Sequence, residues 1–371
     1  MSTTFTRRVS DQLTAYPDLA KLLGKTPAEL KKEVWLFAVP HDDDVAIGGG
    51  LWLKAAIDAG VQVHLLAATD GRMGYCAPEE KADIVKVRAK EMVDSSRILG
   101  VTDPARIHFL GFPDCSLSLY LGRRAIKPGE HDFEGGTGYT GLQGAFVKKL
   151  REIKPTRLIM PSPMDYHPDH QIVYNEMMIC IFHAGGGVWP ELGPSCAVPE
   201  VYEMAIYCDF PSPPTLQLKC DEKTFQAKLD CIAAFKSQKQ IGALVEKVRG
   251  AGPCEYLREV GFSFYDANNY HGLFAGQAIG EPEEISDGEF EDEFGSVEDE
   301  FMDAIMGIAS EVAGQVAEAV AHKVIGGKKA KKAEKKAAKA AAKKVVKKAA
   351  PKKKVVKKKV VGRKVVGKKG K

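Results

Sequence analysis

The chain has 371 residues, of which 44% are hydrophobic and 8% aromatic, and this composition excludes a fibrous protein and a chain that is disordered throughout. The net charge of +4 conceals three regimes: residues 326–371 hold 22 Lys and Arg against one acid, residues 281–303 hold twelve acids and no base, and residues 1–280 are nearly balanced with 30 bases and 34 acids. The sequence therefore predicts a folded domain at 1–280, an acidic linker at 281–303 and a basic tail at 326–371.

The expected location of this protein is intracellular. Its eight cysteines are scattered and form no C-x-x-C pair, which is typical of a reduced compartment. Residues 1–12 are polar and lack the apolar segment of a secretory signal, and no run approaches the roughly 18 apolar residues of a membrane span. We expect a soluble, cytoplasmic protein without a membrane span, and binding of DNA by the basic tail would associate it with the nucleoid.

Apolar runs and helical spacings alternate along the first 160 residues. Residues 34–39 form a continuous apolar, β-prone run, which indicates a strand buried on both faces. Further strands are predicted at 61–68, 107–110 and 158–160, and helices at 48–60, 78–99 and up to 153. This alternation predicts an α/β fold, a Rossmann-like, mostly parallel sheet flanked by helices, in which sites form at the carboxyl ends of strands.

The character of the chain changes after residue 280. The acidic linker is too charged to pack and is expected to be disordered. Apolar residues then recur at steps of three or four over 301–325, which predicts a short amphipathic helix at 304–325 that self-associates or docks on the folded domain. The tail alternates lysines with Ala-Ala or Val-Val, a low-complexity pattern expected to be disordered.

The first polar cluster directly follows the strand predicted at 34–39. It consists of His41, Asp42, Asp43 and Asp44, and three glycines follow at 48–50. One imidazole and three carboxylates at a strand end form a ligand set suited to zinc or another divalent first-row metal. An Asp-rich helix cap would also explain one or two acids, but three acids beside a histidine favour a site.

The second cluster follows the strand predicted at 158–160. His167 and His170 lie three residues apart with Asp169 between them, so one can bind a metal while the other faces the same centre. Together the two clusters supply three ligands and spare acid/base groups, the composition of a catalytic zinc site with an open position for water.

These segments resemble the LmbE/PIG-L-like zinc-dependent N-deacetylases, whose motifs read A-H-P-D-D-E, T-x-G-E-x-G and H-x-D-H. Here the motifs stand at residues 40–45 (PHDDDV), 69–74 (TDGRMG) and 167–170 (HPDH), with further echoes at 111–114 and 228–238. Order and spacing agree, and the resemblance covers roughly residues 30–265.

The resemblance implies a role for each matching residue. His41, Asp44 and His170 would bind Zn²⁺, and Asp43 would be the general base that takes a proton from the metal-bound water. The remaining assignments are catalytic His167, which in its protonated form would stabilise the oxyanion, and Asp169, which would orient its neighbours. The implied reaction is the hydrolysis of an N-acetyl amide on an N-acetylglucosamine-type sugar conjugate, which releases acetate and a free amine.

Four positions depart from the family motifs. Asp42 replaces a proline, Val45 and Arg72 each replace a glutamate, and Phe235 replaces a histidine. No residue that matches a metal ligand is lost, so the departures concern the identity of the substrate. Arg72 is a candidate for binding a sugar hydroxyl or an anionic aglycone, although a solvated or ion-paired arginine explains it equally. Asp114 is a candidate for binding sugar hydroxyls, and a turn-forming aspartate is the alternative.

The basic tail resembles the Lys/Ala-rich tails of linker-histone-like proteins. Its charge predicts salt-dependent, non-specific binding of nucleic acid or another polyanion. An anionic surface, or the acidic linker of the same chain, is an alternative partner. Two functions follow: a zinc-dependent deacetylase localised by its tail, or a catalytically silent sugar-binding or nucleoid-associated DNA-binding protein. The intact Asp43 favours the enzyme.

Overall fold

A computed structural model describes residues 3–74, 76–262 and 265–275. The chain divides into two units, 1–265 and 266–371, and the described part of the second unit contains the helix α10 (Asn268–Phe274). The predicted acidic linker, amphipathic helix and basic tail lie outside the described residues.

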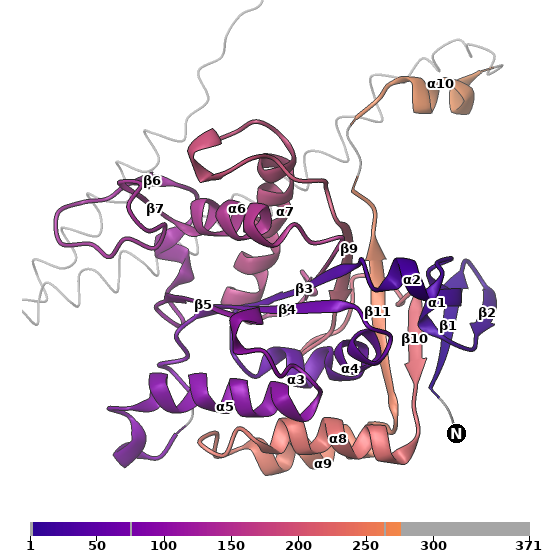
Figure 1. Ribbon diagram of the computed structural model, residues 1–371, viewed down its shortest axis with the longest axis horizontal. Coiled ribbons are helices and arrows are strands. Elements are labelled where there is room, and N and C mark those ends of the chain that lie inside the picture. The colour runs from indigo at the N-terminus through magenta and orange to yellow at the C-terminus, as the bar shows by residue number, and fades with distance from the viewer. Residues whose placement is uncertain (1–2, 75, 263–264, 276–371) are drawn as a thin grey trace, which may run out of the picture. The chain divides into compact units, whose positions relative to one another are not determined.

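A nine-stranded sheet in the order β2-β1-β10-β11-β9-β8-β3-β4-β5 forms the centre of the first unit (Figure 1). The strands β9, β8, β3, β4 and β5 pair in parallel, and β2, β1, β10 and β11 continue the sheet from β9 in antiparallel pairs. A two-stranded ribbon of β6 and β7 lies outside it. The strands are β1 Thr4–Val9, β2 Gln12–Tyr16, β3 Val34–Val39, β4 Gln62–Thr69, β5 Ile107–Phe112, β6 Arg124–Ala125, β7 Tyr139–Thr140, β8 Arg157–Pro161, β9 Glu200–Met204, β10 Leu216–Lys219 and β11 Cys254–Val260.

Helices cover both faces of the sheet. Figure 1 shows α6 and α7 above it, and α3, α4, α5, α8 and α9 below it. The α-helices of the first unit are α1 Leu19–Leu22, α2 Pro27–Leu30, α3 Asp44–Gly48, α4 Gly50–Asp58, α5 Ile84–Ile98, α6 Leu142–Ile153, α7 Pro168–Gly185, α8 Glu222–Ala233 and α9 Ile241–Ala251. Short 3₁₀ helices lie in the connections, namely η1 Pro78–Glu80, η2 Pro104–Arg106, η3 Leu117–Tyr120 and η4 Pro190–Leu192.

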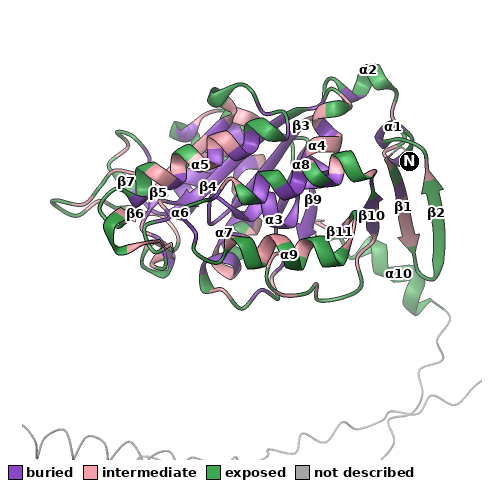
Figure 2. Cartoon of the chain, turned by 90° about the horizontal axis from the view of Figure 1, so that it is seen from below, coloured by how far each residue is buried: buried purple, intermediate pink, exposed green. Residues whose placement is uncertain are grey.

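Two apolar cores lie on opposite faces of the sheet, and β3 contributes to both. Successive side chains of a strand point to opposite faces. Accordingly, Phe37 and Val39 join the core between the sheet and α4, α5 and α8. Leu36 and Ala38 join the core between the sheet and α6 and α7. This double burial explains why β3 is a continuous apolar run, and Figure 2 shows the buried strands between helices with exposed outer faces.

The prediction of an α/β fold with a central sheet flanked by helices is confirmed, but the sheet is mixed rather than mostly parallel. Strands β3, β4, β5 and β8 match the four predicted ones; β3, β4 and β8 are almost fully buried, whereas β5 lies at the edge of the sheet and is only partly buried. The antiparallel half escaped prediction because its strands are short or exposed: β2 has no fully buried residue, and β10 has four residues.

The predicted helix at 48–60 corresponds to α4, which begins at Gly50, and a separate short helix that was not predicted, α3, ends just before it at Gly48. A Cβ at Gly49 would lie 2.9 Å from the sulfur of Met204 and 3.1 Å from the ring of Phe37. The close approach of this helix junction to the sheet therefore requires glycine.

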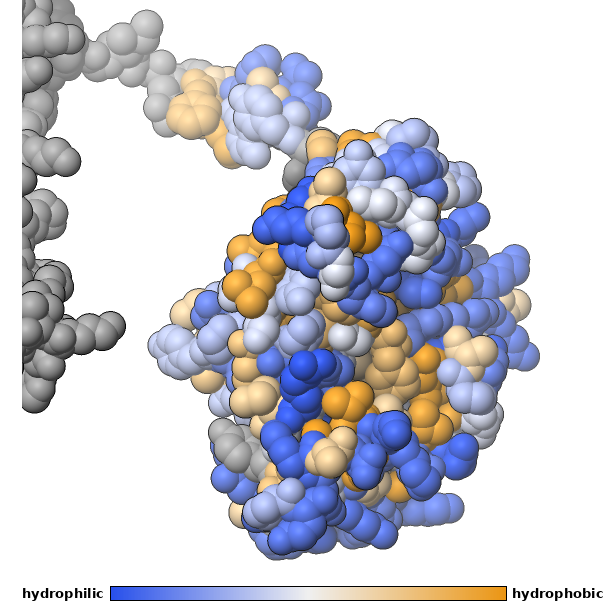
Figure 3. Space-filling model, turned by 90° about the vertical axis from the view of Figure 1, so that its left-hand side faces the viewer, coloured by the Kyte–Doolittle hydropathy of each residue, from blue (hydrophilic) through white to orange (hydrophobic). Residues whose placement is uncertain are grey.

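Figure 3 shows hydrophilic side chains over much of one face, with apolar groups in several separate patches. None of the helices in the described ranges combines the length and the apolar character that a membrane-spanning helix requires.

Candidate active site

The first polar cluster lies where β3 ends and α3 begins, as the sequence predicted. His41, Asp43 and Asp44 are all buried although they are polar. Asp43 occupies the N-cap of α3, yet its side chain makes no capping hydrogen bond. The Asp44 carboxylate turns back and accepts a hydrogen bond of 2.8 Å from the backbone N–H of His41. Helix capping therefore does not explain these acids.

The second cluster lies between β8 and α7. His167 is the N-cap of α7, and His170 lies in the first turn of that helix, fully buried. Because β8 pairs in parallel with β3, the carboxyl ends of both strands lie at the same edge of the sheet. The fold therefore brings the two clusters together, although 129 residues separate His41 from His170.

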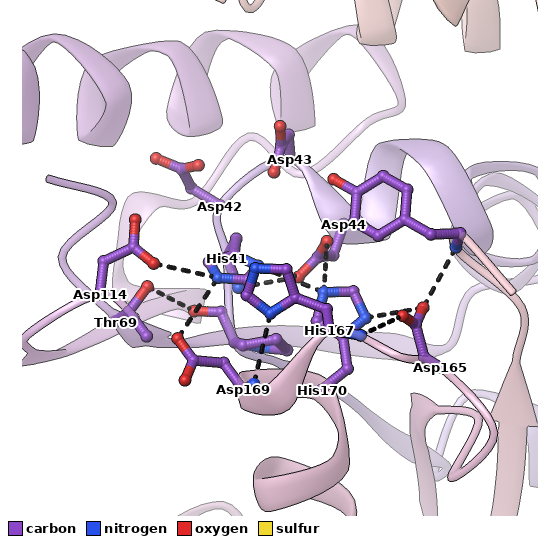
Figure 4. A network of polar contacts seen from close by, with 12 residues as sticks. His41, Asp42, Asp43, Asp44, Thr69, Asp114, Asp165, His167, Asp169 and His170 are labelled. Atoms are coloured by element: carbon purple, nitrogen blue, oxygen red, sulfur yellow. Dashed lines mark hydrogen bonds and ion pairs between the residues drawn. The ribbon is translucent and has the colours of Figure 1, made fainter. Parts of the chain in front are cut away.

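His41, Asp44 and His170 converge on one point (Figure 4). The Nδ1 atom of His41 lies 3.2 Å from the Nε2 atom of His170 and 3.2 Å from Oδ2 of Asp44, and Oδ1 of Asp44 lies 3.3 Å from Nε2 of His170. Ligand atoms bound tetrahedrally to zinc at about 2.0–2.2 Å lie about 3.3–3.6 Å apart. The three side chains are therefore spaced like the ligands of one metal ion, and His41, Asp44 and His170 are called the metal trio below.

The electrostatics of this trio also fit a cation. Oδ1 of Asp44 is buried and accepts no hydrogen bond from the described residues. Burial opposes the charged forms, but the ion pairs with Asp44 raise the pKa of His41 well above its ordinary value and that of His170 to about 9, and both histidines lower the pKa of Asp44. The carboxylates thus stabilise positive charge at this point. The residues present therefore fit the metal that the motifs imply.

The outer nitrogen of each ligand imidazole faces a carboxylate. Nε2 of His41 lies 3.1 Å from Oδ1 of Asp114 and 3.6 Å from Oδ2 of Asp169. Nδ1 of His170 lies 3.0 Å from Oδ2 of Asp165. Such contacts fix the tautomer of a metal-binding histidine and aim its other nitrogen at the metal. In Figure 4, Asp114 and Asp169 flank the cluster on one side and Asp165 on the other.

Sequence analysis missed Asp165. Its side chain is 1% exposed, and it also accepts backbone hydrogen bonds from His167 at 3.0 Å and from Tyr207 at 3.1 Å. The signal was present, because Asp165 lies only two residues before the H-x-D-H motif. One carboxylate thus joins the two histidines of the second cluster.

Arg88 of α5 is the second residue that sequence analysis missed. Its guanidinium is buried and donates a hydrogen bond of 3.1 Å from Nη2 to Oδ1 of Asp43, the predicted general base. It also contacts Asp42, with 2.7 Å from Nε to Oδ1 and a further, shorter contact from Nη2. Burial and the neighbouring Asp43 raise the pKa of Asp42 to about 6 against the attraction of Arg88, so Asp42 and Arg88 form a charged pair at neutral pH. No local sequence pattern links position 88 to positions 42 and 43.

The glycines of the second motif make room for this guanidinium. A Cβ at Gly71, which has a positive φ of 66°, would lie 3.0 Å from Nε of Arg88. A Cβ at Gly74 would overlap Nη1 of Arg88 and lie 2.8 Å from Nε2 of Gln238. The spacing of this motif therefore reflects the packing of Arg88.

His167 lies beside the metal trio, with its ring centroid 4.6 Å from that of His41. One nitrogen each of His41, His167 and His170 lies within 4.8 Å of the others. Burial and the charges of the other two histidines lower the pKa of His167, which favours a neutral ring rather than the protonated one we expected. Its Nδ1 accepts a hydrogen bond of 3.3 Å from the backbone N–H of Asp169, so the proton of a neutral ring lies on Nε2.

Both predicted substrate-binding residues have partners in the protein. Asp114, besides its contact with His41, accepts a hydrogen bond from the backbone N–H of Met73 at 3.0 Å, and these contacts hold its pKa at about 2. Arg72 donates 2.7 Å to Oδ2 of Asp70. The structure therefore brings Asp114 to the metal trio and pairs Arg72 with an acid of its own loop.

The other departures from the family motifs are accounted for by packing. Val45 and Phe235 are buried in the core under α4, α5 and α8. They replace polar motif residues with apolar contacts and leave the metal trio unchanged.

Comparison with known proteins agrees with this geometry. Residues 36–181 match the family model described as PIG-L, GlcNAc-PI de-N-acetylase. The diacetylchitobiose deacetylase of Thermococcus kodakarensis is 32% identical over 136 residues, which are 36% of this chain and 43% of that protein. The 1D-myo-inositol 2-acetamido-2-deoxy-alpha-D-glucopyranoside deacetylase of Kineococcus radiotolerans is 28% identical over 188 residues, 46% of this chain and 51% of that protein.

Among solved structures, the N,N'-diacetylchitobiose deacetylase from Pyrococcus horikoshii covers 65% of this chain and 90% of its own, with 20% identity and a TM-score of 0.48. The chain spans about half the length of the curated relatives it matches. The matched residues 36–181 nevertheless contain all the residues of the metal trio and their carboxylate partners. Over these residues, the chain carries a region similar to the PIG-L de-N-acetylase family.

Proposed function

We propose that this protein is a zinc-dependent N-deacetylase that hydrolyses the N-acetyl amide of an N-acetylglucosamine-type sugar conjugate. The observation that carries the proposal is the convergence of His41, Asp44 and His170 at ligand spacing, with Asp43 and His167 beside them. The similarity of residues 36–181 to the de-N-acetylase family supports it. The sugar class follows from the names of the relatives, which are deacetylases of acetylated glucosamine conjugates.

His41, Asp44 and His170 would hold the metal, which supplies Lewis acidity and lowers the pKa of water towards about 7. Asp43 accepts a proton from the attacking water. Arg88 holds Oδ1 of Asp43, which leaves the other carboxylate oxygen free for this proton transfer. Asp43 then returns the proton to the departing amine.

His167 stabilises the negative charge that develops on the amide oxygen. Because its Nδ1 accepts from the Asp169 backbone, its Nε2–H is available as a donor. An oxyanion donor of this kind contributes about 3–4 kcal/mol to the transition state. Asp165, Asp114 and Asp169 bind no substrate in this scheme and orient the ligand imidazoles.

Metal content and amine release test the proposal. The purified full chain is expected to contain zinc near one equivalent and to release free amine from diacetylchitobiose or a related N-acetylglucosamine conjugate. Asp43→Ala is expected to keep its zinc and lose at least about 100-fold in kcat, because it removes only the base. Asp58→Ala, at an exposed residue of α4 paired with Lys54, serves as the control and should retain full activity.

A metal-loaded chain that releases no amine from any conjugate would contradict the proposal. A chain without bound metal would do so as well. Either result would favour the alternative function, a catalytically silent sugar-binding or DNA-binding protein.

We further propose that residues 326–371 bind nucleic acid or another polyanion without sequence specificity. The 22 Lys and Arg in these 46 residues support it, since cations that neutralise phosphates release counterions. Affinity for duplex DNA should fall steeply between about 50 and 200 mM salt, and should be lost in a chain that ends at residue 325. Equal DNA binding by both chains would refute a role for the tail, and this result bears equally on nucleoid association.

A further inference from the structure

Two arginines are connected to the metal trio through acidic residues, and each is already engaged by a carboxylate. Arg88 is shared by Asp42 and Asp43 and is 4% exposed, so its positive charge faces two negative charges. Asp42 occupies the position at which the family motif has proline. This chain thus adds a carboxylate beside a buried arginine.

Arg72 is engaged in the same way on the loop after β4. Its Nε and Nη2 atoms lie 2.7 and 2.5 Å from Oδ2 of Asp70, whose side chain is 7% exposed. The other oxygen of Asp70 accepts from the backbone N–H of Asp114, 3.3 Å away. Because Asp114 contacts His41, Arg72 is linked to the site through two acids.

The remaining cation at this loop is Lys81, within the described ranges. Its ammonium is exposed and donates to the backbone oxygen of Arg72. By contrast, four further carboxylates line the two clusters, namely Asp44, Asp114, Asp165 and Asp169. The protein groups around the metal trio therefore carry an excess of negative charge, and among the described residues no buried arginine near the trio is left for an anionic ligand.

We propose that the substrate of this site is an uncharged N-acylated sugar conjugate, and that Asp42 and Asp70 select against conjugates carrying a phosphate or carboxylate. This inference rests on the proposed deacetylase function and specifies its substrate class. An arginine binds phosphate or carboxylate through its planar fork of donors. Here the forks of Arg88 and Arg72 are occupied by aspartates, and an incoming anion would meet those aspartates as like charges.

The test compares two substrates that differ in the charge of the aglycone, methyl N-acetylglucosaminide and N-acetylglucosamine 1-phosphate. The full-length holoenzyme is expected to show a kcat/KM at least about tenfold higher for the methyl glycoside, the scale of one charge-assisted hydrogen bond. Asp70→Asn frees Arg72 and should narrow this ratio severalfold. Asp42→Asn removes one of the two carboxylates that engage Arg88 and should also narrow the ratio of kcat/KM values. Asp58→Asn is the matched control, because it frees Lys54 away from the site and should leave the ratio unchanged.

Asp42→Asn leaves a buried arginine with one carboxylate fewer and can destabilise the fold. In that case Asp70→Asn alone decides the question. The Arg72 side chain is 53% exposed, so loss of its carboxylate partner leaves a solvated charge rather than a buried one. Equal or higher kcat/KM for the phosphate conjugate in the wild type would overturn the proposal. So would a ratio that Asp70→Asn leaves unchanged.

Equilibrium binding separates this inference from the proposed function. Both sugars are titrated into the zinc-loaded His167→Ala chain, in which turnover is reduced and the contacts of Arg88 with Asp42 and Asp43 are kept. If the wild type releases no amine but the variant prefers the methyl glycoside, deacetylation is refuted and charge selection stands. Equal binding of the two sugars would refute charge selection whether or not the wild type is active.

Discussion

Asp165→Asn tests whether a single buried carboxylate controls the affinity for the metal. Asp165 accepts three hydrogen bonds, from Nδ1 of His170 and from the backbone N–H groups of His167 and Tyr207. The amide of asparagine has one acceptor oxygen and one donor nitrogen. Whichever way it is turned, the NH₂ group meets a donor, either the His170 ring or the His167 backbone.

The expected magnitude follows from this mismatch. A buried donor left without a partner costs about 1–3 kcal/mol. If the mismatch falls on His170, the ring can avoid it only by moving its proton to Nε2, the nitrogen that faces Asp44 and His41. Loss of such a carboxylate partner typically weakens metal binding about 10–100-fold, which corresponds to about 1.4–2.7 kcal/mol. The two magnitudes agree.

Competition with a chromophoric chelator measures the zinc affinity of the wild type and the variant. Thermal unfolding of both apoproteins reports the purely structural cost. Asp221→Asn is a matched control, because Asp221 caps α8 through a 2.8 Å hydrogen bond from the Thr224 backbone. The reasoning is refuted if Asp165→Asn retains zinc within about threefold of the wild-type affinity, or if its affinity loss equals that of the control.

Two further predictions concern stability. His64 and His108 form a stacked pair with facing nitrogens 3.0 Å apart, and burial, Lys149 and His64 lower the pKa of His108 to about 4. The unfolded state therefore binds a proton at His108 before the folded state does. The free energy of unfolding should accordingly decrease as the pH falls from 6.5 towards 4. His108→Gln should flatten the pH dependence of the free energy of unfolding between pH 6.5 and 4. Urea titrations at several pH values measure this free energy, and an unchanged dependence on pH in the variant would contradict the prediction. Gly74→Ala should cost about 1–3 kcal/mol, because its Cβ overlaps Arg88, whereas Gly242→Ala on α9, with open space around its Cβ, should not lower the melting temperature.

The sequence alone predicted four of the five strands in the parallel half of the sheet, and it singled out His41, Asp44 and His170 as candidate ligands. Strands buried on both faces are continuous apolar runs, so β3 and β8 are visible without tertiary information. The candidate ligands that follow such strands are visible for the same reason, because β3 and β8 pair in parallel and end at one edge of the sheet. The antiparallel strands were not visible, since β2 is exposed and carries no apolar pattern.

The groups that orient this trio depend on tertiary structure. Arg88 reaches Asp42 and Asp43 across 46 and 45 residues, and a helix position gives no sign of which side chain it will meet after packing. Asp165 could be any turn aspartate until the fold turns it towards His170. Local sequence thus determined which residues stand at the ends of the buried strands. Packing of the helices against the sheet decided which charges meet there, because ion pairs form between side chains that only the folded chain brings together.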